Sequence, residues 1–376
     1  MLQKATKHSG FLREYESDIE CIKDTLRLVT VVFRHGQRTP ADTYPTDPHI
    51  NDSMVPYGWG QLTNEGKLNQ YNQGLYLRKR YGKLLGTVYS PDIFYLRSTE
   101  VDRTKMSAML EAAALWRPEQ NQIFKEDLPW QPVILHYEPK DKDNLLLTTP
   151  CPAYFQELDR VMKSAEIIKL QEENELMYQE LRNFTGLNIR NPDDIWSLYG
   201  TLRAEADLNL TFPYWVKNYY PEKLEPLTKI SYIIKIWNPL LQKLRGGPLV
   251  RAIVESMRNK TKGILNPNAR KMYMYSGHDG SVTSLLGSLG VWELQMPDYN
   301  IMTMLELHED QNGWNVQIFL RNSTKVEPYS LTLPGCSTIC PFNDFLELVK
   351  SIIPEDWESE CQVEDSNYIP PSPSPP

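Results

Sequence analysis

An apolar run near the start of this chain ends in two arginines that flank a histidine. Leu26–Phe33 has the β-branched and aromatic residues of a buried strand, and Arg34-His35-Gly36-Gln37-Arg38 follows it at once. In open α/β sheets, ligands bind beyond the carboxyl ends of the strands, where we expect these side chains to lie. Guanidinium groups suit phosphoryl oxygens, and an imidazole among them suits a nucleophile that attacks phosphorus. The alternative interpretation is a surface turn with both arginines solvated.

A second strand-to-helix unit repeats this arrangement. The short apolar run Ile93–Leu96 ends at Arg97-Ser98-Thr99, after which apolar residues recur at helical spacing. Arg103 is therefore expected in the first turn of a helix, with Ser98 or Thr99 as its N-cap. An anion beside Arg103 would also meet the free backbone N–H groups of that helix start.

A third unit follows much later in the chain. The expected strand Met272–Tyr275 turns at Ser276-Gly277, and His278 and Asp279 then open a helix. Taken singly, His278 is most simply a hydrogen-bonded histidine and Asp279 a helix N-cap. Taken together, the three units predict that their polar residues meet at one edge of a sheet.

The order of these motifs resembles that of the histidine acid phosphatases, the branch of the phosphoglycerate-mutase-like superfamily that includes prostatic, lysosomal and insect venom acid phosphatases. The resemblance runs from about Leu26 to Cys361, and it also covers the segments Tyr44–Pro48, Gly60–Thr63, Leu77–Tyr81, Arg97–Thr104, Trp130–Pro132, Tyr275–Asp279 and Leu333–Cys336. It implies an α/β fold, a phosphoglycerate-mutase-like three-layer sandwich with a mainly helical inserted cap domain.

The same resemblance implies an acid phosphatase that hydrolyses phosphate monoesters through a phosphohistidine intermediate. His35 would be the nucleophile and Asp279 the proton donor, and the phosphate oxygens would be held by Arg34, Arg38, Arg103 and His278. No cofactor or metal is expected, because these cationic groups supply the positive charge. Since a carboxyl group must be protonated to act as an acid, we expect work at acidic pH. Gln37 and Gly280 stand where several relatives carry Asp and Thr.

Two alternative functions remain at this point. Phytases and inositol-polyphosphate phosphatases belong to the same superfamily, and their densely charged substrates favour extra basic residues in the cap. A secreted binding protein that retains the fold without turnover belongs to a different class, and the presence of His35, Arg103 and Asp279 weighs against it. The net charge of -8 argues against nucleic acid or an anionic membrane as a partner.

Composition along the chain predicts four segments. Residues 24–140 and 230–365 are expected to form the two parts of an α/β core, with a mainly helical cap at 141–229 between them and a disordered Pro/Ser tail at 366–376. The cap aromatics, among them Trp196, Tyr199, Trp215 and Tyr219, are expected mostly in the cap's own core, with some at the substrate entrance. The tail is either a plain end or the start of a stalk whose membrane anchor is absent. No stretch of transmembrane length and no apolar signal-peptide core is found.

Five cysteines are compatible with two disulfides and one free thiol. The resemblance pairs Cys151 with Cys361 and Cys336 with Cys340, and it leaves Cys21 outside the pattern. It also implies a homodimer, because Trp130-Gln131-Pro132 and His136 match a segment that lies at a two-fold interface in animal relatives; otherwise Trp130 belongs to the core. The chain has five N-glycosylation sequons, at Asn51, Asn183, Asn209, Asn259 and Asn322, which favour a secreted or lysosomal glycoprotein.

Overall fold

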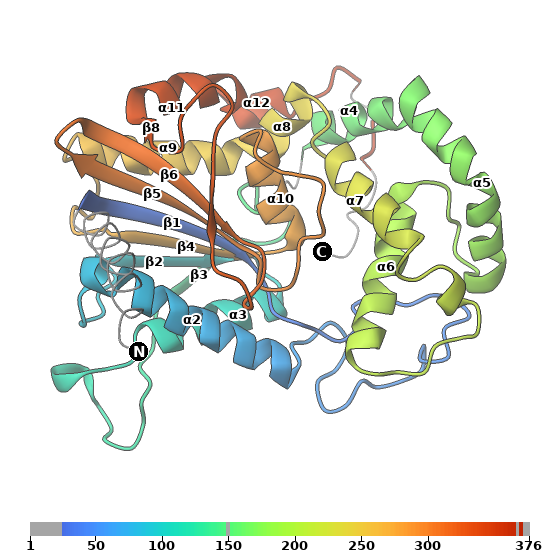
Figure 1. The fold of residues 1–376 in the computed structure, drawn as a ribbon, viewed down its shortest axis with the longest axis horizontal. Helices are drawn as coiled ribbons and strands as arrows, with labels where there is room; N and C mark the ends of the chain where they lie inside the picture. The colour runs from blue at the N-terminus through green and yellow to red at the C-terminus, as the bar shows by residue number, and fades with distance from the viewer. Residues whose placement is uncertain (1–24, 148–150, 366–367, 371–376) are drawn as a thin grey trace, which may run out of the picture.

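A mixed β-sheet forms the centre of the larger of two lobes (Figure 1). The computed structural model describes residues 25–147, 151–365 and 368–370, so Cys21 and most of the predicted tail lie outside the described residues. Within these residues the sheet is eight-stranded, with the order β3-β2-β4-β1-β5-β6-β7 and β8 paired to β6. Its strands are β1 (Leu26–Arg34), β2 (Phe94–Ser98), β3 (Leu135–Tyr137), β4 (Met272–Gly277), β5 (Met302–Asp310), β6 (Gly313–Arg321), β7 (Tyr329–Leu331) and β8 (Cys340–Pro341).

The strand directions bring the three predicted junctions to one edge of the sheet. β1 pairs with β4 in parallel, and β4 pairs with β2 in parallel. In this register Arg34 is opposite Gly277, and Ser98 is opposite Ser276, so the strand ends are level with one another. β2 and β4 each run two residues further than the sequence pattern predicted, because backbone pairing continues through the polar residues at their ends.

Helices cover both faces of the sheet, as the predicted sandwich requires (Figure 1). One face packs on α2 (Asn64–Leu85) and α3 (Asp102–Leu115), and the other on α9 (Gly247–Thr261), α10 (Asp279–Ser288) and α11 (Phe342–Val349). Alternate residues of β1 enter the two resulting cores, and this burial on both faces explains why its sequence is continuously apolar. The expected α/β fold class is confirmed.

The second lobe consists mainly of helices that come from the middle of the chain. They are α5 (Ala165–Thr185), α6 (Pro192–Asp207) and α7 (Leu224–Ile234), and Tyr178, Trp215 and Tyr219 contribute to their shared core. The loop after β1 also enters this core, because Tyr44 packs edge-on against Trp215. The segment boundaries derived from composition stay a prediction.

Both disulfide pairings implied by the resemblance are present. The Cys151–Cys361 bond ties the start of α4 (Pro152–Met162) to the end of α12 (Trp357–Glu360), across a sequence separation of 210 residues. The Cys336–Cys340 bond closes a short loop before α11. Helix α8 (Pro239–Arg245) packs against α4, so the first bond lies in a core that joins the middle of the chain to its last described helix.

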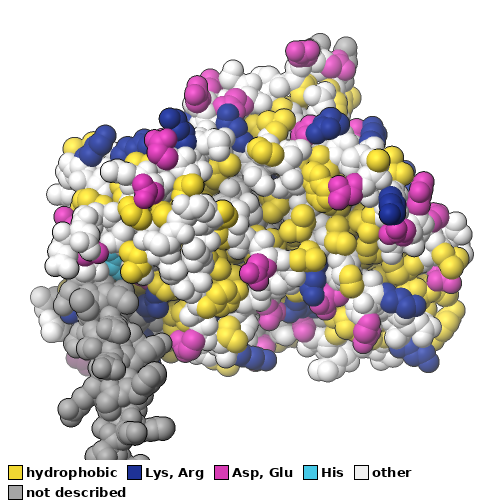
Figure 2. All heavy atoms as spheres, turned by 45° about the horizontal axis from the view of Figure 1, so that its top comes forward, with side chains coloured by type: hydrophobic (Ala, Val, Ile, Leu, Met, Phe, Trp, Pro, Cys, Tyr) yellow, Lys and Arg dark blue, Asp and Glu magenta, His cyan; other side chains and the backbone are white. Residues whose placement is uncertain are grey.

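The surface drawn in Figure 2 has basic and acidic side chains interspersed rather than gathered by sign. The face drawn therefore has no large patch of one sign of charge. Among the described helices, none has both the length and the apolar character needed to cross a membrane.

Candidate active site

His35 has one tautomer defined by its two neighbours. Its Nδ1 lies 2.8 Å from the carbonyl oxygen of Gly36, an acceptor, so Nδ1 carries the proton and donates it. Its Nε2 lies 3.1 Å from Nε of Arg103, which is only a donor, so Nε2 accepts. The lone pair of a buried imidazole therefore lies on Nε2, next to a guanidinium.

The surroundings of His35 keep its ring uncharged. Burial and the positive charges of Arg103, Arg34, His278 and Arg38 hold the pKa of His35 well below its usual range. An exposed histidine would be mostly protonated in mildly acidic solution, and its nitrogen lone pairs would be lost. His35 keeps its nucleophilic lone pair under those conditions.

The loop that follows β1 is held by close backbone contact with the first turn of α2. A Cβ on Gly36 would lie 2.5 Å from the carbonyl oxygen of Gly66, so only glycine allows this approach. The Gly36 N–H donates to the hydroxyl of Ser107 on α3, and the side-chain amide of Gln70 donates to the carbonyl of Arg34. Both helices therefore position His35.

Arg34 and Arg38 present guanidinium groups that are only partly hydrogen-bonded. Arg34 donates to the carbonyl of Pro297 at 2.6 Å, and its guanidinium lies 4.5 Å from the centre of the Tyr299 ring. Arg38 donates to the carbonyl of Thr39 at 3.0 Å. Within the described residues, the buried Nε atoms of both arginines have no hydrogen-bond partner. Because an unpaired buried donor is costly, these atoms favour an anionic ligand.

Arg103 lies in the first turn of α3, as predicted, but the predicted N-cap is wrong. The N-cap residue is Val101, which makes no side-chain cap bond. The Thr99 hydroxyl is instead hydrogen-bonded to Thr104 and to Nε2 of His278, so a tertiary contact uses the group that the local pattern assigned to the helix. Burial, together with the nearby Arg38, lowers the pKa of Arg103 to about 9, which leaves it charged in acid.

His278, not Asp279, is the N-cap residue of α10. Its ring centre lies 5.5 Å from that of His35, edge to face, and burial together with Arg103 holds the pKa of His278 well below its usual range. Asp279 is the first helical residue, and its Oδ2 lies 3.0 Å from Nη2 of Arg34. The structure therefore brings all six predicted residues to one place: Arg34, His35, Arg38, Arg103, His278 and Asp279.

The carboxyl group of Asp279 is ionised over most of the pH range. Burial raises the pKa of Asp279, but the charges of Arg34 and His278 and the hydroxyl of Tyr232 more than offset this and hold the pKa at about 2. Asp279 is therefore a carboxylate even at acidic pH.

A cavity between the two lobes opens over these groups. It has about 740 Å³ of space, part of it open to solvent. Its second wall comes from α6 and α7 and from the segment before β5, and its lining side chains there include Trp196, Tyr199, Arg203, Tyr232 and Tyr299. Two of the cap aromatics, Trp196 and Tyr199, line this cavity, and their place at a substrate entrance stays a prediction.

Three lining residues were missed by the sequence reasoning. Tyr232 lies in an ordinary amphipathic helix, and Arg203 and Tyr299 belong to no motif. The guanidinium groups of Arg34 and Arg203 both lie on the Tyr299 ring, at 4.5 and 4.8 Å from its centre. No local signal marks these residues, because only the packing of the lobes brings them to the cavity.

Comparisons with known proteins agree with this geometry. The model of the histidine phosphatase superfamily (branch 2) matches residues 25–316. Prostatic acid phosphatase of Rattus norvegicus is 39% identical over 89% of this chain and 89% of its own length. Venom acid phosphatase of Apis mellifera is 36% identical over 90% of this chain and 88% of its own length. Lysosomal acid phosphatase of Xenopus laevis is 37% identical over 90% of this chain and 79% of its own length.

Solved structures with this fold include two bacterial phytases. The phytase of Citrobacter braakii superimposes with a TM-score of 0.64 at 18% identity, covering 90% of this chain and 100% of that one. The phytase of Hafnia alvei in complex with myo-inositol hexakis sulphate gives a TM-score of 0.66 at 16% identity, covering 90% and 98%. At such low identity the likeness shows a shared fold.

Proposed function

Because the chain belongs to branch 2 of the histidine phosphatase superfamily and is an acid phosphatase that hydrolyses phosphate monoesters, we propose which of its residues carry out the reaction. Nε2 of His35 attacks phosphorus to form a phosphohistidine. Arg34, Arg38, Arg103 and His278 bind the phosphate oxygens. The observation that carries this proposal is the buried, uncharged imidazole of His35, whose Nε2 lies 3.1 Å from a guanidinium.

The reaction has two steps with Asp279 acting in both. In the first, the bond from Nε2 of His35 to phosphorus forms as the ester P–O bond breaks, and the leaving oxygen takes a proton from the carboxyl group of Asp279. In the second, the Asp279 carboxylate takes a proton from water, whose oxygen attacks phosphorus and releases the His35 nitrogen. The surrounding guanidiniums stabilise the phosphoryl oxygens in both steps.

The low pKa of Asp279, about 2, requires a source for the proton that it donates. A phosphate monoester loses its second proton near pH 6, so below that pH it arrives as a monoanion that still has one P–OH group. We infer that this proton passes to Asp279 and then to the leaving oxygen. The acidic working range therefore reflects the protonation of the substrate rather than that of the free enzyme.

The kcat/KM for phosphate release should thus fall by about tenfold per pH unit above the second pKa of the substrate, roughly pH 6 for an alkyl phosphate. Below that pH it should change far less, because the lowered pKa of His35 keeps the ring uncharged further into acid than an exposed histidine. Measurements from pH 3.5 to 8 with several monoesters test this. The pH at which kcat/KM begins to fall should follow the second pKa of each substrate. One common pH for all substrates would instead indicate an enzyme group and contradict the proton source proposed here.

A homodimer is proposed from the region around β3. β3 lies at an edge of the described sheet, and the loop before it projects from the larger lobe (Figure 1). Several apolar side chains of this loop are exposed. Trp130 is 40% exposed and Phe124 is 63% exposed, so Trp130 does not lie in the core. Light scattering should give twice the chain mass at micromolar concentration, and Trp130→Glu should give the monomer mass. A monomer for the unaltered protein would refute the proposal.

A secreted or lysosomal location is proposed from the relatives and from the sequons. Prostatic and lysosomal acid phosphatases are among the relatives, and the sequon residues Asn51, Asn183 and Asn209 are exposed. Exposure is what glycosylation of an asparagine requires. Material secreted from animal cells should gain electrophoretic mobility after treatment with an N-glycosidase, and unchanged mobility would contradict glycosylation.

A further inference from the structure

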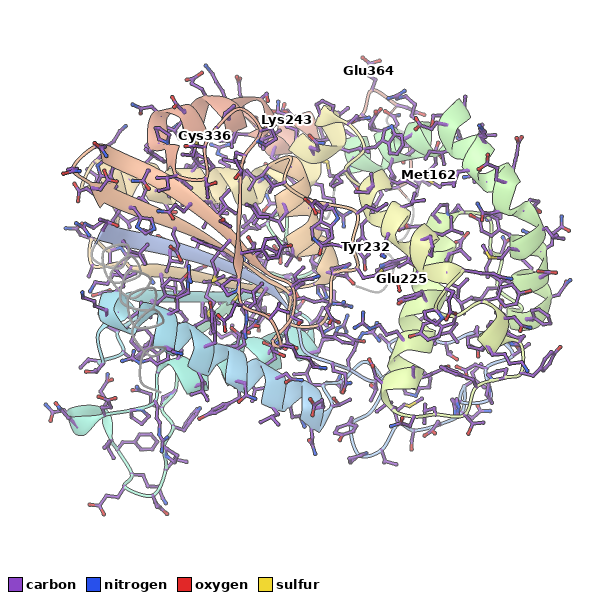
Figure 3. The ribbon with its side chains drawn as sticks, viewed as in Figure 1. Met162, Glu225, Tyr232, Lys243, Cys336 and Glu364 are labelled. Carbon is purple, nitrogen blue, oxygen red and sulfur yellow. A yellow bond between two sulfur atoms is a disulfide. The ribbon has the colours of Figure 1, made fainter. Side chains whose placement is uncertain are left out.

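A tyrosine from the second lobe contacts the proposed proton donor. Tyr232 lies on α7, and Figure 3 shows it between the two lobes, close to the amino end of α10. Its side chain is 4% exposed, and its hydroxyl oxygen lies 3.0 Å from Oδ2 of Asp279. The residue thus belongs to the cap-side wall of the cavity and yet reaches a group on the core side.

The direction of this hydrogen bond follows from a second contact. The indole Nε1 of Trp196, on α6, lies 2.8 Å from the same hydroxyl oxygen. Because an indole N–H can only donate, the Tyr232 oxygen accepts that bond, and its own proton is directed to Asp279. The Trp196 ring is itself held by Lys235, whose ammonium nitrogen lies 4.1 Å from the ring centre. The orientation of the phenol is therefore set from the cap.

We propose that Tyr232 is a positioning residue for Asp279, one that fixes the orientation of the carboxyl group so that its proton is given from Oδ1. This inference rests on the proposed function, because it requires Asp279 to be the proton donor. A hydrogen bond to the charged form of an acid favours that form. Because Asp279 is already ionised in the free enzyme, the bond acts through the orientation of the carboxyl group, and this orientation matters most when the leaving oxygen is strongly basic and needs the proton.

The contacts of Asp279 also distinguish its two oxygens. Oδ2 receives the Tyr232 hydroxyl and the Arg34 guanidinium, each at 3.0 Å, which occupies both of its lone pairs. Among the residues that the structure describes, Oδ1 receives one donor, the backbone N–H of Gly280 at 2.7 Å. One lone pair of Oδ1 is left to hold a proton. Tyr232 and Arg34 thus direct the transferable proton to Oδ1.

The substitution Tyr232→Phe removes one oxygen atom and keeps the ring. For an alkyl phosphate, kcat/KM should fall by about tenfold, since the carboxyl group of Asp279 is no longer held in one orientation for proton transfer. For an activated aryl phosphate, whose oxygen leaves with little help, kcat/KM should change by less than about twofold. The ratio of the two values is the decisive measurement, because a general loss of structure lowers both together.

Tyr219→Phe is the matched control. Tyr219 lies in the core of the second lobe, and its hydroxyl also donates to a carboxylate, that of Glu180 at 2.7 Å. In this variant, the ratio of kcat/KM for the alkyl phosphate to kcat/KM for the aryl phosphate should equal that of the unaltered protein. A second test variant, Trp196→Phe, removes the indole donor and should lower the ratio in the same direction as Tyr232→Phe. The combined variant should lower it no further than Tyr232→Phe alone.

An unchanged alkyl-to-aryl ratio in Tyr232→Phe would overturn the positioning role, as would an equal loss for both substrate classes. Failure of the proposed function itself would be seen separately, in the unaltered protein. There, rapid quenching would trap no phosphohistidine. A trapped phosphohistidine together with an unchanged ratio would leave the proposed function standing and remove only the role of Tyr232.

Discussion

Replacing His35 by alanine should lower turnover of every phosphate monoester by at least about 10⁴-fold and remove the covalent phosphoenzyme. The physical reason is that Nε2 of His35 has a lone pair, and burial together with neighbouring positive charge keeps this nitrogen unprotonated in mild acid. His278 is proposed to bind a phosphate oxygen instead, and the hydrogen bond between its Nε2 and the hydroxyl of Thr99 holds its ring in place. Without the imidazole, the residues proposed to bind phosphate are still in place, but no group is left to accept the phosphoryl group.

Rapid quenching with a ³²P-labelled substrate measures this directly. The quench should be alkaline, because a phosphohistidine is labile in acid. His49→Ala is a suitable control: His49 binds the carbonyl of Thr211 outside the cavity, and its loss should leave both the label and turnover unchanged. Protein-bound label in the His35→Ala variant, with turnover retained, would show that another residue is the nucleophile.

Replacing Asp279 by asparagine should have an effect that depends on the leaving group. Asparagine has nearly the same size but cannot give a carboxyl proton, so kcat/KM for alkyl phosphates should fall by about 10²- to 10⁴-fold. For activated aryl phosphates, the rate of the first step, which forms the phosphohistidine, should fall far less. Because the second step also lacks its base, phosphoenzyme should accumulate with aryl substrates. Steady-state rates with both substrate classes, together with rapid quenching, check each of these results.

The control for this variant removes a nearby negative charge that has no proposed proton role. Asp298 forms an ion pair with Arg203 at the edge of the cavity. Asp298→Asn should therefore change the two substrate classes by the same factor, through the charge at the cavity edge alone. If Asp279→Asn kept its alkyl-phosphate turnover, or lost both classes equally, Asp279 would not be the proton donor.

The residues proposed to bind phosphate could be predicted from the sequence because their signal is local. Arg34, His35 and Arg38 directly follow a buried strand, and Arg103 lies one turn into the helix that follows another. Strand direction and pairing are then enough to bring such junctions together, and the register of β1, β4 and β2 does so. The sequence alone thus determined the sheet edge, the cationic groups on it and the histidine among them that is proposed as the nucleophile.

The tertiary structure decided what those groups do. The tautomer of His35 depends on the carbonyl of Gly36 and on the guanidinium of Arg103 from α3. The low pKa of Asp279 depends on Arg34, which lies at the end of a neighbouring strand. Tyr232 reaches the site only because α7 packs beside α10. Hydrogen-bond direction, burial and charge proximity are properties of three-dimensional neighbours, and residues distant in the chain carry no local pattern that reveals them.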